Sequence, residues 1–156
     1  MNTPASPRAH FGIRFSLLAR RWRRIIDGHL AEAGLSDATW VPLVHLQETG
    51  GGISQKELAA LVGIDGSSLV RVLDILEREG VIERRRGESD GRARLIHLTP
   101  GGKVRVSEIR AELAEVENAM LTELSDTEIE TLLQQFAKIE QRMNALGEEI
   151  KPEKKQ

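Results

Sequence analysis

Cysteine is absent from this chain of 156 residues, and aromatic residues are few, with two Trp, three Phe and no Tyr. Without cysteine the chain can form no disulfide, iron–sulfur cluster or thiolate zinc site, and it fits a reducing compartment. The scarcity of aromatic rings argues against binding of RNA or single strands by base stacking. No apolar run approaches the roughly 18–20 residues of a membrane span, and no export signal is present. We therefore expect a cytoplasmic protein with no membrane partner.

Residue groups that are typical of catalysis or metal binding are also missing. The four histidines are scattered, without an i, i+3 or i, i+4 pair, at His10, His29, His45 and His97. This spacing predicts no metal site. No Ser/His/Asp grouping, glycine-rich phosphate loop or paired carboxylate motif stands out, so we expect neither an enzyme nor a cofactor.

Charge is sorted along the chain, although the net charge is only −2. The C-terminal third is rich in Glu, whereas the first stretch sets one acid, Asp27, against six arginines: Arg8, Arg14, Arg20, Arg21, Arg23 and Arg24. A sorted distribution can present a basic face to a polyanion while the molecule stays soluble.

Long amphipathic helices are predicted at both ends of the chain. Apolar residues recur in steps of three and four over residues 11–33 and again over residues 103–146. One copy of the chain has little to cover such stripes, so we expect these helices to hold a homodimer together.

The middle of the chain, residues 36–99, predicts a winged helix-turn-helix. Ser54 and Glu57 form a capping box, Gly63 ends that short helix, and Asp65 caps the helix that runs to Gly80. The segments VIERRR and RLIHL then read as two short strands joined by a loop. The expected fold is mainly α with a small β-wing, in a single domain over residues 1–156.

In a helix-turn-helix, the N-terminal half of the second helix meets base edges, and here it carries Ser67, Ser68 and Arg71. Arginine suits bidentate contact with guanine, although the two serines can equally be first-turn residues near a cap. Successive residues of the strand at 84–86 alternate between faces, so at most two of its arginines share a surface. The predicted DNA-contacting set is Ser54, Gln55, Ser67, Ser68, Arg71, Arg84, Arg86, Asp90, Arg92 and Arg94.

The residues then show a resemblance to a known family. The segments WRRIIDGHL, LSDATWVPL, GIDGSSLVRVLDILEREGVIERR and SDGRARLIHLT resemble the MarR family of transcriptional regulators, specifically its SlyA branch. The D-x-R of the wing, Asp90 and Arg92, followed by a strand and LT, is the most specific signature. The resemblance implies a homodimer with interlocked terminal helices that binds a palindromic operator and, in many members, releases it on binding a small aromatic acid.

By the same resemblance, a pocket for an aromatic acid is expected at the seam between the dimer helices and the winged helix. Its predicted residues are Arg20, Trp40, Val44, Arg71 and Val72. An aromatic wall with a guanidinium at its edge suits an aromatic carboxylate. The alternative function is a winged-helix module that binds protein and not DNA, and arginines kept at both the recognition helix and the wing argue against it.

Overall fold

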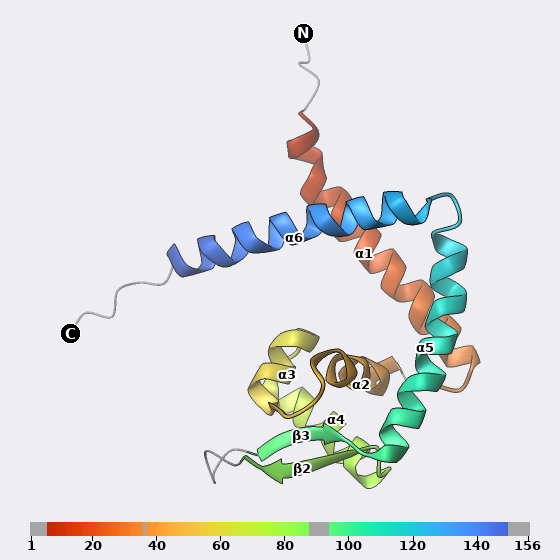
Figure 1. Cartoon of the computed structure of the whole chain (residues 1–156), viewed down its shortest axis with the longest axis vertical. Helices are drawn as coiled ribbons and strands as arrows, with labels where there is room; N and C mark the ends of the chain where they lie inside the picture. Colours follow the sequence, from red (N-terminus) through yellow and green to blue (C-terminus); the bar gives the residue numbers. More distant parts are fainter. Residues whose placement is uncertain (1–5, 36, 88–93, 150–156) are drawn as a thin grey trace, which may run out of the picture. The chain divides into compact units, whose positions relative to one another are not determined.

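The computed structural model describes residues 6–35, 37–87 and 94–149 (Figure 1). The chain divides into two compact units, Met1–Glu117 and Asn118–Gln156, which are described separately. The predicted single domain over residues 1–156 stays a prediction.

Two helices open the first unit. Helix α1, Pro7–Glu32, begins before the predicted start at Phe11, because proline is well accommodated in a first helical turn, where its missing N–H is not needed. Helix α2, Asp37–Thr49, follows. Ser36, which precedes this helix, lies outside the described residues.

The predicted helix-turn-helix is confirmed as α3, Gln55–Val62, and α4, Gly66–Arg78. The Ser54 hydroxyl accepts from the Glu57 N–H at 3.1 Å, and the Glu57 carboxylate accepts from the Ser54 N–H at 2.8 Å. Gly63 ends α3 with φ of 77°, in the left-handed region that residues with a side chain rarely adopt. The turn between the two helices is therefore set by local sequence.

The sheet has three antiparallel strands in the order β1-β3-β2, where the sequence predicted two. β2, Ile82–Arg86, and β3, Arg94–Leu98, form the wing hairpin, with Arg84 opposite Ile96. The additional strand β1, Ile53–Ser54, pairs with β3. Two residues are too few to show the alternation by which a strand is recognised in sequence.

Helix α5, Pro100–Met120, leaves the wing through a tight junction. The Thr99 hydroxyl donates to the Gly80 carbonyl at 2.6 Å and accepts from the Gly102 N–H at 3.0 Å. Thr99 is therefore the N-cap of the helix that begins with Pro100. The junction fixes the start of α5 against the end of α4.

The core of the first unit lies where these helices and the sheet meet. Residues from α1 to α5 and from β3 are exposed by 1% or less: Leu30, Leu43, Leu46, Leu58, Leu69, Leu73, Leu76, Ile96, Val106 and Ile109. Burying each is worth about 1.5–3 kcal/mol.

The second unit holds the end of α5 and helix α6, Asp126–Glu149. A capping box opens α6: the Ser125 hydroxyl accepts from the Glu128 N–H at 3.2 Å, and the Glu128 carboxylate accepts from the Ser125 N–H at 2.8 Å. The apolar stripe of α6 is exposed, with Leu133 at 59% and Met143 at 64%. Within the described part of the chain, no helix is long and apolar enough to cross a membrane.

Candidate nucleic-acid interface

Helix α4 presents one polar face and one buried face. Leu69, Leu73 and Leu76 are fully buried and hold the helix on the core, at spacings that put them on one side. Ser67, Ser68 and Arg71 are exposed. The predicted recognition residues therefore lie on the solvent side of α4, as a DNA-reading helix requires.

The two serines at the start of α4 are engaged with its N-cap. The Ser67 hydroxyl donates to Asp65 Oδ1 at 2.5 Å, and the Ser68 hydroxyl donates to Asp65 Oδ2 at 2.8 Å. The Ser68 N–H also donates to Oδ1 at 2.9 Å. These hydrogen bonds hold the pKa of Asp65 well below its usual value, and the bond from Ser67 has the largest effect.

The cap limits what these serines can contact. Each hydroxyl has one hydrogen, so neither Ser67 nor Ser68 donates to a phosphate while it is bonded to Asp65. Their oxygens can still accept from a base amino group in the major groove. A DNA-contacting role for the serines stays a prediction. While the cap is intact, their hydroxyl oxygens can only accept hydrogen bonds from DNA.

Ser54 and Gln55 have structural partners at the start of α3. Ser54 belongs to the capping box, and Gln55 Nε2 donates to the Gly66 carbonyl at 3.5 Å. The Gln55 bond joins the beginning of α3 to the beginning of α4. Contact of either residue with DNA stays a prediction.

Arg84, a predicted DNA contact, has ion-pair partners on α4. Its guanidinium donates to Asp74 at 3.0 Å and lies 3.5 Å from Glu77, both on α4, and its side chain is only 19% exposed. Its Nε is buried with no hydrogen-bond partner among the described residues. Two carboxylates thus engage this cation, and Arg84 ties the wing to α4. Its contact with DNA stays a prediction and would have to compete with both carboxylates.

Two arginines face each other at the root of the wing. Arg86 of β2 is the register partner of Arg94 of β3, and both are exposed. Directly opposed residues lie on the same sheet face, and like charges in that position destabilise a strand pair. Arg85, one residue earlier, lies on the alternate face and is paired with Glu83. The Arg86–Arg94 pair therefore concentrates positive charge at the root of the wing.

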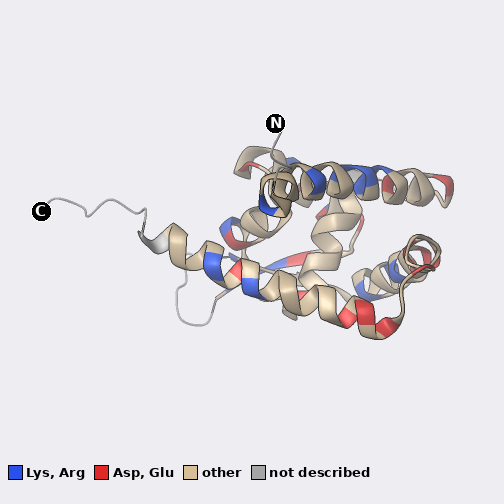
Figure 2. Cartoon of the chain, turned by 90° about the horizontal axis from the view of Figure 1, so that it is seen from above, with Lys and Arg blue, Asp and Glu red and all other residues tan. Residues whose placement is uncertain are grey.

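The remaining predicted wing contacts, Asp90 and Arg92, lie outside the described residues. Further arginines lie along α1, where Figure 2 shows the blue segments. Glutamate and aspartate mark the first turns of α6 in the same figure. The sorted charge that the sequence predicts is thus carried by separate helices.

The surroundings of Trp40 include an arginine that the sequence did not assign to the ligand pocket. The Arg23 guanidinium lies 4.6 Å from the centroid of the Trp40 ring, and Arg23 Nε donates to Asp27 at 3.0 Å. Trp40 Nε1 donates to the same carboxylate at 3.1 Å. The four-residue spacing of Arg23 and Asp27 on α1 is a sequence signal that could have found this group.

The other predicted ligand residues are spread over three helices. Arg20 is exposed on α1, Val44 and Val72 are half-buried on α2 and α4, and Arg71 is exposed. A cavity of about 490 Å³ lies elsewhere, lined by the end of α2, the wing strands and the start of α5, including Arg85, His97 and Lys103. None of the five predicted ligand residues lines that cavity, and their role stays a prediction.

The order of a helix-turn-helix, a β-hairpin and long flanking helices defines a winged-helix protein of the kind that regulates transcription. Comparison with known proteins agrees with this class: the MarR family model matches residues 33–93. The solved structure of transcriptional regulator PA3341 is 36% identical, with a TM-score of 0.77, and the match covers 86% of this chain and 98% of that one.

Two further structures are similar over most of their length. The transcriptional regulator SlyA is 25% identical with a TM-score of 0.71, covering 90% of this chain and 99% of that chain. The repressor CouR, solved on a 23-mer DNA duplex, is 26% identical with a TM-score of 0.68, covering 82% and 90%. The chain belongs to the MarR family, whose members are transcriptional regulators and not enzymes.

Proposed function

We propose that this protein is a homodimeric transcriptional regulator that binds a pseudo-palindromic operator in double-stranded DNA, a repressor of the SlyA-like branch that works in the cytoplasm. The observation that carries the proposal is the exposed Arg86–Arg94 pair at the root of the wing. Opposed like charges destabilise the hairpin, and a phosphate backbone relieves that repulsion. The CouR relative, solved on a DNA duplex, supports the same partner.

Direct readout is assigned to α4 and backbone or minor-groove contact to the wing. Arg71 is exposed on the polar face of α4, where a bidentate contact with guanine is possible. Arg86 and Arg94, together with the predicted wing residues Asp90 and Arg92, contact phosphates or the minor groove. Arg84 is left out of this set because Asp74 and Glu77 engage it.

The operator test is a gel shift on DNA from upstream of the protein's own gene, at several salt concentrations. We expect a specific complex whose affinity falls steeply with salt. Arg71→Ala should cost roughly 1–3 kcal/mol of binding and relax the preference at particular base pairs. Equal affinity for the operator and for unrelated DNA, unchanged in Arg71→Ala, would contradict direct readout. No complex with either DNA would favour the protein-binding alternative.

The dimer is supported by apolar side chains that a single chain leaves exposed. They are found on α1 and on α6: Phe11, Ile13, Leu17, Leu18, Leu132, Leu133, Ile139, Met143 and Leu146. Light scattering should report a dimer at micromolar concentration. Leu132→Asp should weaken it, whereas Gln134→Asp, on the polar side of the same helix, should not. A folded wild-type monomer at that concentration would exclude the dimer.

A further inference from the structure

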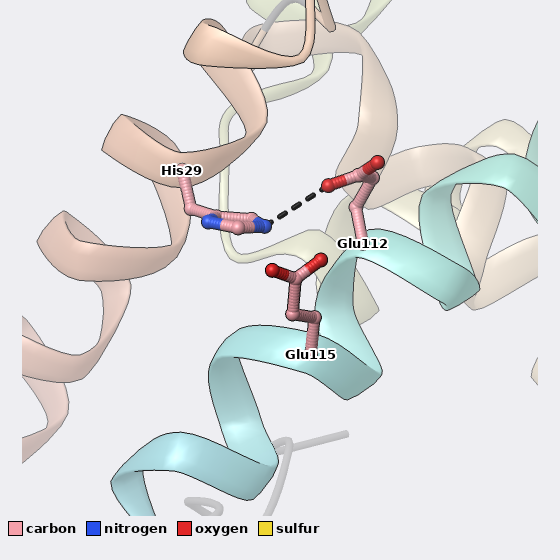
Figure 3. A group of neighbouring side chains, drawn as sticks. All are labelled: His29, Glu112 and Glu115. Carbon is pink, nitrogen blue, oxygen red and sulfur yellow. Dashed lines mark hydrogen bonds and ion pairs between the residues drawn. The ribbon is translucent and has the colours of Figure 1, made fainter.

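A histidine and two glutamates from distant parts of the chain come together on the first unit. His29 projects from α1, and Glu112 and Glu115 project from α5, toward one another (Figure 3). One candidate ligand atom from each residue lies within 4.8 Å of those of the other two. His29 Nε2 is 3.0 Å from Glu112 Oε2. The spacing of the histidines predicted no metal site. His29 and Glu112 are 83 positions apart in the sequence, and only the fold brings them together.

The cluster carries more negative than positive charge. Glu112 and Glu115 are three residues apart on one helix face, where like charges repel, and one imidazole supplies at most a single positive charge. The neighbouring groups on the same helices do not correct the balance. Glu108, one turn before Glu112, faces Arg105 at 3.9 Å, and Glu32 lies one turn after His29. A cation added at this point would therefore be electrostatically favoured.

We infer that His29, Glu112 and Glu115 bind one divalent transition-metal ion of the zinc, cobalt or nickel class. One imidazole nitrogen with two carboxylate oxygens is a donor set that such ions accept, with water completing the coordination. Metal–ligand bonds of about 2.0–2.2 Å place neighbouring donors roughly 3–3.5 Å apart. His29 and Glu112 already have this separation. Glu115 is exposed, so side-chain rotation can bring its carboxylate closer.

The bound ion would link the end of α1 to the middle of α5. His29 and Glu112 are both half-buried, so water can reach the open coordination positions. An ion that binds only the folded chain stabilises it by mass action. Metal addition should therefore raise the melting temperature as well as occupy the site.

The test uses the full-length protein, stripped of metal with a chelator and titrated with Co²⁺ alone while its visible absorption is recorded. We expect one ion per chain and Zn²⁺ displacement of the cobalt signal. Glu115→Gln should weaken binding about tenfold or more. This variant leaves the His29–Glu112 bond intact and removes only one donor charge. Glu117→Gln, which removes a carboxylate from another face of the same helix, should bind as the wild type does.

Two results would overturn the assignment. One is no cobalt spectrum and no rise in melting temperature at millimolar Co²⁺ in the wild type. The other is equal affinity in wild type, Glu115→Gln and His29→Gln, which would place the metal away from this cluster. His45→Gln serves as the matched histidine control, and retention of its metal affinity supports the His29 site. Because the readout is metal binding alone, it is independent of whether the protein binds DNA.

Discussion

The Arg84 guanidinium on β2 and the Asp74 carboxylate on α4 lie 3.0 Å apart and join the wing to the recognition helix. Glu77 adds a second carboxylate at 3.5 Å. Positions on the wing and on α4 are therefore coupled through one side chain. The two carboxylate partners of Arg84 set it apart from Arg86 and Arg94, which are exposed at the root of the wing.

Replacing Arg84 by Met should destabilise the fold more than it affects DNA readout. The variant loses a charged hydrogen bond and leaves two carboxylates facing an apolar side chain, which we expect to cost about 1–2 kcal/mol. Arg85→Met, at an exposed neighbour paired with Glu83, should change stability by no more than about 0.5 kcal/mol. Urea denaturation of both variants measures the difference. Equal stabilities would show that the Asp74 contact contributes nothing.

Arg86→Ala should have the opposite pattern. It removes one member of the opposed Arg86–Arg94 pair, so the fold should be as stable as the wild type or slightly more stable. Loss of a phosphate contact should weaken DNA binding at all sequences and lower the slope of log affinity against log salt by about 1. Gel shifts over a salt series, with melting temperatures, test both parts. An unchanged slope would remove Arg86 from the interface.

The Asp65 cap should make α4 sensitive to acid. Because the pKa of Asp65 is lower in the folded protein than in the unfolded chain, its charge stabilises the fold above the ordinary value of 3.8. That contribution is lost as the pH falls below this value. Asp65→Asn keeps an acceptor for the Ser68 N–H but loses the charge, so it should melt below the wild type at pH 7.

The difference between the two melting temperatures should shrink as the pH is lowered below about 4, where the wild-type carboxylate begins to lose its advantage. Calorimetry at a series of pH values measures it. If the difference in melting temperature is the same at every pH, the charge of Asp65 does not contribute to the stability of the cap.

Gly102 should tolerate no side chain. A Cβ at this position would lie 1.9 Å from the Val81 carbonyl oxygen, whereas one at Gly101 would lie no closer than 3.6 Å to its nearest neighbour, the Gly80 carbonyl oxygen. Gly102→Ala should therefore force α5 away from the end of α4, with a loss of about 1–3 kcal/mol or more. Gly101→Ala is the matched control, and similar stability of the two variants would contradict the close approach.

How much of this structure can be predicted from the sequence depends on how far apart in the sequence the interacting residues lie. Caps such as Ser54–Glu57 and Asp65, and the periodic apolar residues of the helices, act over a few residues and could be read directly. The sequence did not predict β1, because a strand of two residues is too short to show an alternation of apolar and polar residues. The sequence did not predict the contacts of Arg84 and His29, because only the fold brings α4 next to β2 and α5 next to α1.

The arrangement around Trp40 leads to a prediction about aromatic acids. Trp40 is 7% exposed, its Nε1 donates to Asp27, and Arg23 lies over its ring. A salicylate-like ligand that stacks on this ring must displace the Arg23 guanidinium or pair with it, so Arg23 should matter more than Arg20. The apolar Val44 and Val72 offer no polar partner, so we expect millimolar affinity, about −4 kcal/mol.

Fluorescence titration with salicylate measures this in a Trp22→Phe background, where Trp40 is the sole indole. We expect quenching that saturates in the millimolar range, parallel release of operator DNA, and loss of both responses in Arg23→Gln. Arg20→Gln, on the same helix, should weaken both responses less than Arg23→Gln does. If operator release requires Arg20 but not Arg23, the ligand binds away from the Trp40 ring. If neither signal changes up to tens of millimolar, Trp40 is a core residue and the protein is not regulated by aromatic acids.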